Sequence, residues 1–191
     1  LQTAATLTAA PLFIPRHVLG SATAPGANEQ IVVGIVGMGE RGNQLVSNIP
    51  ESGRLAAICD ADSRKTALAT KTHKADWTVY QDYRAMFEQQ DLDAVIICPC
   101  DHHHVMAGIL ACQAGKDIYV EKPLSLYIRE GRALVNSARK YKRVAQTGTQ
   151  QRTMEMNRFA CEFVRDGGIG DIRAVECINF TGPISYPAAG L

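Results

Sequence analysis

The sequence predicts an α/β fold with a doubly wound parallel sheet, followed by the start of a second α/β domain. Two observations support the first part of this prediction. Runs of β-branched and other apolar residues, of which Ile31–Val36 is the clearest, have the composition of strands that are buried on both faces. These runs alternate with stretches of helical length, and this alternation favours parallel strands joined by right-handed crossovers.

The first strand ends directly in a glycine-rich turn, Gly37-x-Gly39-x-x-Gly42. Gly37 permits a tight bend, Gly39 lets a ligand approach the backbone, and Gly42 lets the next helix pack close to the strand, with its unpaired N–H groups facing a phosphate. A second strand, Leu55–Cys59, is closed by Asp60, near the spacing of about 20 residues at which a carboxylate binds an adenosine ribose. The pattern predicts a dinucleotide site, and the alternative is a structural turn with a surface aspartate.

The remaining elements of this domain each have a local signal. Helices are expected over Gln44–Ile49, Arg64–His73 after a capping Ser63, Tyr83–Gln90 after a capping Asp82, and Val105–Ala114, which ends at Gly115. Strands are expected over Trp77–Tyr80 and over Asp93–Cys98, which is ended by Pro99. The last crossover consists of strand Asp117–Val120, amphipathic helix Leu126–Tyr141 and a sixth strand, Val144–Thr147.

The pattern changes after Thr153. A helix over Met154–Arg165 is followed by glycines, and Asp171–Phe180 is expected to form a longer strand. We therefore divide the chain into an export-signal remnant and linker (residues 1–29), a nucleotide-binding domain (30–150) and the incomplete start of a second domain (151–191).

Composition argues against several kinds of partner and site. The net charge of +1 over 191 residues, 46% of them hydrophobic, gives no indication of a nucleic-acid partner. No apolar run reaches the roughly 18 residues of a membrane-spanning helix. The six cysteines form neither a C-x-x-C pair nor a zinc-ligand spacing, so we expect core packing rather than a disulfide framework.

The first residues indicate export. Leu1–Pro15 is rich in Ala, Thr and Leu and carries no charge, as in the end of a signal peptide whose basic region is missing. The alternative is an N-terminal arm of a cytoplasmic protein. We expect the chain to be a fragment that is inactive on its own.

Four groups of residues fall at the carboxyl ends of the predicted strands, where open parallel sheets bind ligands. They are the glycine turn, Asp60, the segment Pro99–His104 and Glu121-Lys122-Pro123. Lys122 directly follows a buried strand, so its ammonium group could hydrogen-bond a substrate hydroxyl or lose a proton if desolvated. The alternative is a solvated lysine at a strand end.

The run His102-His103-His104 resembles a metal-binding sequence. Consecutive side chains at the start of a helix point about 100° apart, however, so the three rings cannot all bind one ion. Further ligands at a suitable spacing are lacking. We expect no metal, with Asp101 as a helix cap and one or two of the histidines lining the cleft.

These motifs, in this order, resemble those of the Gfo/Idh/MocA oxidoreductase family. They are Gly37-Met38-Gly39-Glu40-Arg41-Gly42, Cys59-Asp60, Asp101-His102-His103-His104, Ala114-Gly115-Lys116-Asp117 and Glu121-Lys122-Pro123-Leu124-Ser125. Two further segments, Ile14–Gly20 and Gly148-Thr149-Gln150-Gln151-Arg152, resemble exported bacterial members, many of which use twin-arginine export.

The resemblance implies a Rossmann domain that binds NAD(H) or NADP(H), then an α/β domain whose mostly antiparallel sheet supports oligomerisation and forms one wall of a sugar site. In the family, the lysine matching Lys122 contacts nicotinamide and substrate and assists proton transfer, while the second acid/base belongs to the following domain. Asp60 matches the residue that binds the adenosine ribose, and its charge favours NAD over NADP. The candidate cofactor-binding residues are Gly37, Met38, Gly39, Arg41, Gly42, Asp60, Pro99, Asp101, His104, Glu121, Lys122 and Gln150.

We therefore expect the cofactor-binding part of an exported, periplasmic NAD-dependent oxidoreductase, with Lys122 as catalytic residue. It would transfer a hydride between nicotinamide and a sugar, cyclitol or related polyol, and would form a homo-oligomer at full length. Two alternatives remain: a glycoside hydrolase that oxidises its sugar transiently, and a dinucleotide-binding module without turnover.

Overall fold

The computed structural model describes Gly26 and residues 29–178. The expected export segment, Leu1–Pro15, lies outside these residues. The chain divides into two units, the first ending at Gly148 and the second beginning at Thr149.

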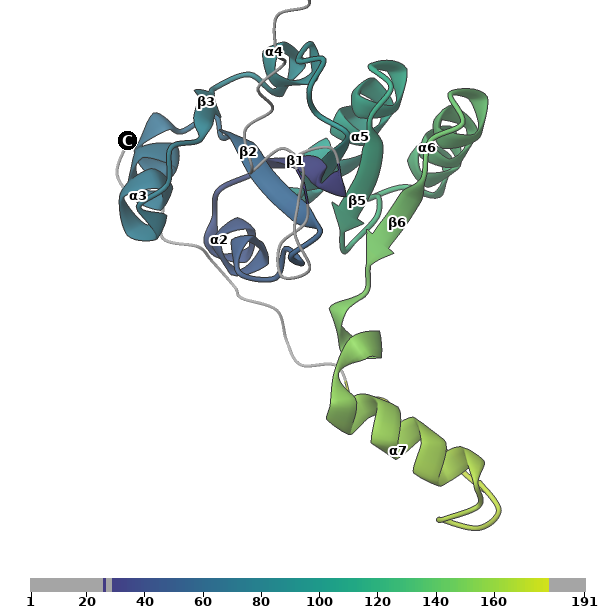
Figure 1. Cartoon of the computed structure of the whole chain (residues 1–191). Helices are drawn as coiled ribbons and strands as arrows, with labels where there is room; N and C mark the ends of the chain where they lie inside the picture. Colours follow the sequence, from purple (N-terminus) through teal and green to yellow (C-terminus); the bar gives the residue numbers. More distant parts are fainter. Residues whose placement is uncertain (1–25, 27–28, 179–191) are drawn as a thin grey trace, which may run out of the picture. The chain divides into compact units, whose positions relative to one another are not determined.

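A six-stranded, all-parallel sheet forms the first unit, in the order β3-β2-β1-β4-β5-β6 (Figure 1). From the central β1 the chain winds outward to β3, returns to pair β4 with β1, and winds outward again to β6. This topology confirms the predicted doubly wound sheet. The strands are β1 (Ile31–Val36), β2 (Gly53–Cys59), β3 (Thr78–Tyr80), β4 (Ala94–Ile97), β5 (Asp117–Glu121) and β6 (Ala145–Gly148).

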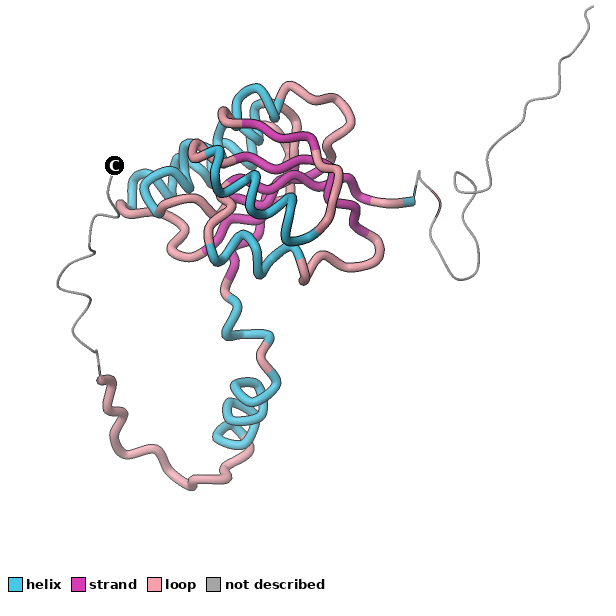
Figure 2. Tube along the Cα trace, turned by 90° about the vertical axis from the view of Figure 1, so that its left-hand side faces the viewer, coloured by secondary structure: helices cyan, strands magenta, loops and turns pink. Residues whose placement is uncertain are grey.

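Helices cover both faces of this sheet (Figures 1 and 2). On one face α5 (His104–Gln113) contacts both α4 (Tyr83–Phe87) and α6 (Ile128–Lys140). On the other face lie α2 (Glu40–Val46) and α3 (Ser63–His73). In the part of the chain that the structure describes, no helix is both long and apolar enough to cross a membrane.

Two hydrophobic layers result, one on each face of the sheet. Ile35 and Ile58 pack with residues of α2 and α3 in what we call the α2/α3 layer. Their neighbours Val36 and Ala57 pack with residues of α4, α5 and α6 in the α4–α6 layer. Successive side chains of a strand point to opposite faces, so the continuous apolar runs of the sequence supply both layers.

Two caps that the sequence predicted have different outcomes. The Asp82 side chain accepts a hydrogen bond from the Arg84 N–H at 2.9 Å and caps α4, as predicted. Ser63 was the wrong cap for α3, because the preceding Asp62 accepts from the Arg64 N–H at 3.0 Å and Ser63 is already helical. Both residues are good N-caps, and the backbone of Asp62 is the one that remains extended.

The starts of α2 and α5 also differ from the prediction. α2 begins at Glu40, directly after the turn, rather than at Gln44. Asp101 is not a side-chain cap: it lies inside a 3-10 helix, η2 (Asp101–His103), that leads into α5. The predicted end of α5 is confirmed by Gly115, whose φ of +79° places it in the left-handed region.

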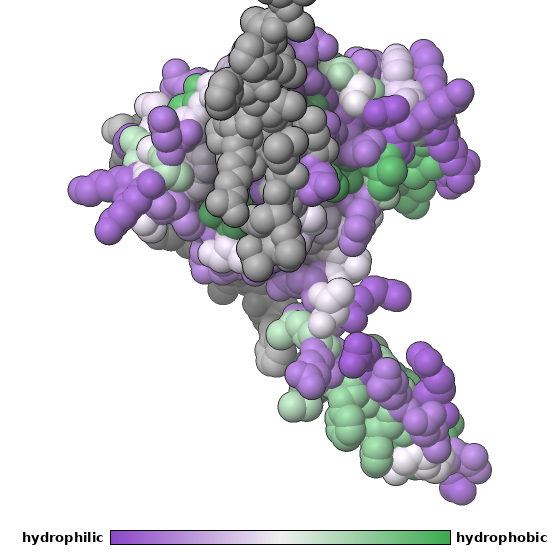
Figure 3. Space-filling model, in the orientation of Figure 1, coloured by the Kyte–Doolittle hydropathy of each residue, from purple (hydrophilic) through white to green (hydrophobic). Residues whose placement is uncertain are grey.

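The second unit contains η3 (Gln150–Thr153) and α7 (Glu155–Arg165). Residues 171–178 form no strand, so the predicted strand Asp171–Phe180 is wrong over the residues that the structure describes; its last two residues lie outside them. A strand requires a hydrogen-bonded neighbour, which an apolar pattern alone cannot provide. Apolar side chains on α7, including Phe159 and Phe163, are exposed in this unit (Figure 3).

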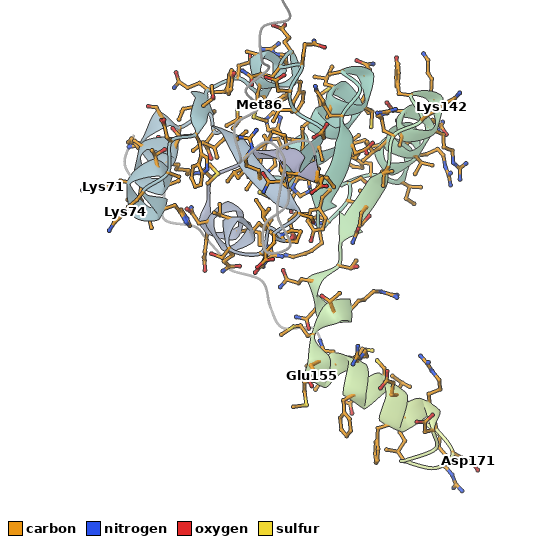
Figure 4. All side chains as sticks on the ribbon, in the orientation of Figure 1. Lys71, Lys74, Met86, Lys142, Glu155 and Asp171 are labelled. Atoms are coloured by element: carbon orange, nitrogen blue, oxygen red, sulfur yellow. The ribbon has the colours of Figure 1, made fainter. Side chains whose placement is uncertain are left out.

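Met86 of α4 is fully buried against the sheet and gives a test of the packing (Figure 4). A Cβ placed on Gly34 of β1 would lie 3.2 Å from the Met86 methyl carbon, so helix and strand are in close contact. We expect Met86→Ala to lower the free energy of unfolding by about 2–5 kcal/mol, because it leaves a cavity. Met106→Ala, at a methionine of α5 that is 55% exposed, should change it by less than about 0.5 kcal/mol. Urea denaturation measures both, and equal effects would contradict this packing.

Candidate functional site

The carboxyl ends of four neighbouring strands are level with one another. Strand register pairs Val36 with Cys59 and with Ile97, and pairs Ile97 with Val120. The residues that follow these strands therefore emerge along one edge of the sheet. The chain reverses its winding between β1 and β4, and ligands of doubly wound sheets bind at such a point.

The glycine turn after β1 is fixed by close backbone contacts. Gly37 has φ +96°, and a Cβ there would lie 2.5 Å from the Cys98 carbonyl oxygen. A Cβ on Gly42 would lie 2.0 Å from the Gly37 carbonyl oxygen. At Gly39, in contrast, an added Cβ would have no atom within 4 Å. Two glycines thus permit close packing, and the third leaves open space beside the backbone.

Asp60 connects the end of β2 to this turn. Its Oδ2 accepts a hydrogen bond from the Met38 N–H at 2.8 Å, and its Oδ1 accepts from the Asp62 N–H at 2.9 Å. The Lys65 ammonium nitrogen lies 3.9 Å from Oδ2. An ionised carboxylate has about four acceptor positions, so Asp60 can shape the turn and still accept from a ligand hydroxyl. The Met38 side chain is buried, which leaves only its backbone at the turn.

A cleft of about 550 Å³ lies along this edge. Five of the predicted cofactor-binding residues line it: Gly37, Gly39, Arg41, Asp60 and Pro99. His102 and His103 also line the cleft, as expected for one or two of the three histidines, and Cys100 of the predicted segment Pro99–His104 lies beside them. The wall further contains residues that were not predicted to bind the cofactor, namely Val36, Glu40, Cys59, Ala61, Asp62, Lys65, Gln81, Tyr83 and Cys98. Tyr83 and Gln81 follow β3, and their position after a parallel strand was the available signal.

The three consecutive histidines separate. His102 and His103 line the cleft, with ring centroids 4.5 Å apart. His104 is buried, its Nδ1 2.7 Å from the Pro123 carbonyl oxygen and its Nε2 3.2 Å from that of Pro99. His104 was predicted to bind the cofactor, but its ring connects the segments after β4 and β5 instead. Among the described residues no group of three or more His, Cys, Asp or Glu side chains is arranged to hold a metal ion.

Lys122 is exposed and directly follows β5, at the same edge of the sheet. The peptide bond between Lys122 and Pro123 is cis. Glu121, also predicted to bind cofactor, is buried and forms an ion pair with Arg41 at 2.7 Å. Gln150 lies in the second unit, exposed in η3.

Two buried thiols lie under the cleft. Burial, with a smaller contribution from the charge of Asp60, raises the pKa of Cys59 to about 12. Burial, together with the charge of Glu121, raises the pKa of Cys98 to about 12. The Cys98 thiol donates to the Gly37 carbonyl oxygen at 3.2 Å. Both therefore act as packing residues, as predicted, whereas Cys100 is exposed on the cleft wall.

This geometry agrees with a comparison against known families. Residues 31–149 match the family model of the Gfo/Idh/MocA oxidoreductases, described as an oxidoreductase family with an NAD-binding Rossmann fold. The chain belongs to this oxidoreductase family.

The curated proteins that are similar to this chain include oxidoreductases and glycosyl hydrolases. The uncharacterized oxidoreductase YrbE of Bacillus subtilis is 30% identical over 145 residues, which are 74% of this chain and 42% of YrbE. Glycosyl hydrolase family 109 protein 2 of Shewanella sp. (strain ANA-3) is 36% identical over 121 residues, which are 58% of this chain and 26% of that protein. The chain thus spans less than half the length of these relatives.

Solved structures give the same fold. Scyllo-inositol dehydrogenase from Lactobacillus casei, with NAD(H) and scyllo-inositol bound, aligns with a TM-score of 0.67 at 27% identity. The alignment covers 74% of this chain and 43% of that enzyme. Myo-inositol 2-dehydrogenase from Lactobacillus plantarum aligns with a TM-score of 0.68 at 26% identity, over 75% of this chain and 43% of the enzyme.

The thiols give a chemical test of the cleft. At about pH 8, a thiol with a pKa of about 12 is ionised to about one part in ten thousand, so Cys59 and Cys98 should resist iodoacetamide. Cys100 should react quickly, and saturating NAD should protect it while exposed Cys161 of α7 reacts unchanged. Peptide mass spectrometry after timed labelling measures the rates. If Cys98 reacted as fast as Cys100, the contact between the glycine turn and the segment after β4 would not persist in solution.

Proposed function

We propose that this chain is the nucleotide-binding part of an NAD-dependent oxidoreductase that transfers a hydride between nicotinamide and a sugar, cyclitol or related polyol. The observation that carries the proposal is the open space at Gly39, within a turn whose other two glycines are tightly packed. A side chain at this position would project into space that a pyrophosphate can use. The inositol dehydrogenases among the structural relatives support the polyol class.

The residues of the cleft fit a dinucleotide. The backbone around Gly39 would face the pyrophosphate, and the free acceptor positions of Asp60 would bind the adenosine ribose hydroxyls. Tyr83 and Pro99 offer apolar surface in the same wall. Lys122, at the end of β5, lies at the edge where the nicotinamide and substrate would meet.

The charges near Asp60 favour NAD over NADP. Asp60 and Asp62 are both acidic, and a 2′-phosphate would be repelled by them. The Arg64 guanidinium is paired with Asp62 through two contacts of 2.9 Å, Nε to Oδ1 and Nη2 to Oδ2, so its charge is already compensated. The Lys65 ammonium nitrogen lies 3.9 Å from Oδ2 of Asp60. Both cations at this corner therefore face carboxylates, which would compete with a 2′-phosphate for them.

In the proposed reaction Lys122 orients and polarises the substrate oxygen. Its ammonium group has three N–H donors and can hydrogen-bond the hydroxyl or carbonyl oxygen at the reacting carbon. The bound cofactor would supply the redox chemistry, accepting or donating the hydride. A second acid/base, which we assign to the domain that follows in the relatives, would exchange the proton.

The glycosidase alternative is favoured by one specific observation, the 36% identity to a family 109 glycosyl hydrolase. Such an enzyme would use the same cofactor site and the same Lys122, but would return the hydride at the end of each turnover. The two functions therefore differ in net reaction and share the residues of this unit.

Three further proposals rest on the sequence. Export to the periplasm is supported by the composition of Leu1–Pro15 and by the segment Ile14–Gly20. Residues 151–191 are proposed to begin a substrate-binding domain, since the relatives continue well beyond the matched part. A homo-oligomer is proposed for the full-length protein on the resemblance to the family.

Calorimetric titration of NAD and NADP tests the nucleotide site. Wild type should bind NAD more tightly than NADP. Gly39→Ala should retain the melting temperature, because the added methyl meets no protein atom, and should weaken NAD binding at least about tenfold, or about 1.4 kcal/mol. Asp60→Ala should weaken NAD binding and reduce the preference over NADP. Asp91→Ala, at an exposed carboxylate before β4, is the control. Unchanged affinity in Gly39→Ala would contradict the assignment.

Turnover assays on the full-length protein separate the candidate reactions. With NAD and either myo-inositol or scyllo-inositol, a dehydrogenase should accumulate NADH in proportion to the polyol consumed. Lys122→Ala should lower the rate of NADH formation about 10²- to 10⁴-fold. A glycosidase should release p-nitrophenol from a p-nitrophenyl glycoside without net NADH. Nucleotide binding with neither reaction would favour a non-catalytic module.

A further inference from the structure

An ion pair joins the glycine turn to the end of β5. Arg41, in the first turn of α2, donates a hydrogen bond from Nε to Oε1 of Glu121 at 2.8 Å, and its Nη2 lies 2.7 Å from the same oxygen. The Glu121 side chain is 3% exposed and that of Arg41 is 28% exposed. Since β1 and β5 are separated in the sheet by β4, the Arg41 side chain reaches across the carboxyl end of β4.

The second oxygen of Glu121 contacts the backbone of the proposed catalytic residue. Oε2 accepts a hydrogen bond from the Lys122 N–H at 3.1 Å. One carboxylate therefore contacts both the guanidinium group from the nucleotide turn and the peptide nitrogen of Lys122.

The surroundings of Glu121 restrict the carboxylate further. Gly148 of β6 pairs with Glu121 of β5, and a Cβ on Gly148 would lie 2.7 Å from the Tyr119 hydroxyl oxygen and 2.9 Å from Glu121 Oε1. Tyr119 and Gly148 thus lie against the same oxygen that Arg41 contacts. Burial, and then the charge of Glu121, raises the pKa of the Tyr119 hydroxyl, which keeps it protonated.

Stability alone does not explain such a pair. Desolvation of two charges can cost as much as their attraction returns, and well-packed apolar residues can replace a buried ion pair with no loss of stability. Loss of a single partner is costly, because it leaves a buried charge uncompensated. The location of the pair, between the turn and Lys122, is therefore more informative than its contribution to folding.

We propose that Arg41 and Glu121 are positioning residues, which fix the backbone of Lys122 relative to the glycine turn and so hold the lysine in place against the nicotinamide half of the bound dinucleotide. The proposal rests on the proposed function. The sequence analysis expected Glu121 to contact the cofactor directly. In this proposal Glu121 instead affects cofactor binding by holding Lys122 in position.

The test compares NADH with ADP-ribose, which lacks the nicotinamide. In Arg41→Met/Glu121→Leu, where both charges are removed together, NADH affinity should fall about tenfold, while ADP-ribose affinity should stay within about twofold. Glu121→Gln, which keeps an acceptor for the Lys122 N–H, should show a smaller loss. Titration calorimetry gives the affinities, and the fluorescence of bound NADH reports the nicotinamide environment. Exposed Glu88→Gln and Arg129→Lys are the matched controls.

A double-mutant cycle with Lys122→Ala decides whether the pair acts through the lysine. If it does, adding Arg41→Met/Glu121→Leu to Lys122→Ala should cause no further loss of NADH affinity. Equal weakening of NADH and ADP-ribose would overturn the proposal and assign Arg41 to the phosphates. Unchanged NADH affinity, or additive effects with Lys122→Ala, would also overturn it. A folded wild type that bound neither ligand would overturn the proposed function itself.

Discussion

The contact between the glycine turn and the segment after β4 is the constraint on which the site depends. Three stretches of backbone meet there: the end of β1, the start of α2 and the residues after β4. The space for a Cβ is absent at Gly37 and at Gly42, so these stretches approach as closely as backbone atoms allow. Because the strand ends are level, Gly39, Asp60 and Lys122 follow neighbouring strands along the same edge of the sheet as this contact.

Polar groups around the cleft are satisfied mainly by one another. Asp60 binds two backbone N–H groups, Asp62 pairs with Arg64, and Glu121 pairs with Arg41. Such pairing shapes the site before a ligand arrives, which lowers the conformational cost of binding. The remaining acceptor positions of Asp60 stay available to a ligand.

The sequence was sufficient for the sheet and the turn because their signals are local. Apolar runs, glycine spacing and a carboxylate after β2 each depend on a few neighbouring residues. The directions of His104 and Glu121 were not predictable in this way, because they depend on carbonyl groups of Pro99 and Pro123 and on a guanidinium from α2. Likewise, residues 171–178 were expected to form a strand from their apolar pattern, but they pair with no strand in the described part of the chain, because pairing is a property of the fold rather than of the segment.

The two hydrophobic layers have an evolutionary consequence. The α2/α3 layer supports the glycine turn through Met38 and Leu45, whereas the α4–α6 layer supports β5, which ends in Glu121 and leads to Lys122, through Ile118 and Val120. The sheet separates them, and energetic effects of substitutions at such separated positions are close to additive. Selection can therefore alter the residues around Lys122 without repacking the side chains that support the glycine turn. A lineage could retain one nucleotide while it changes its reaction.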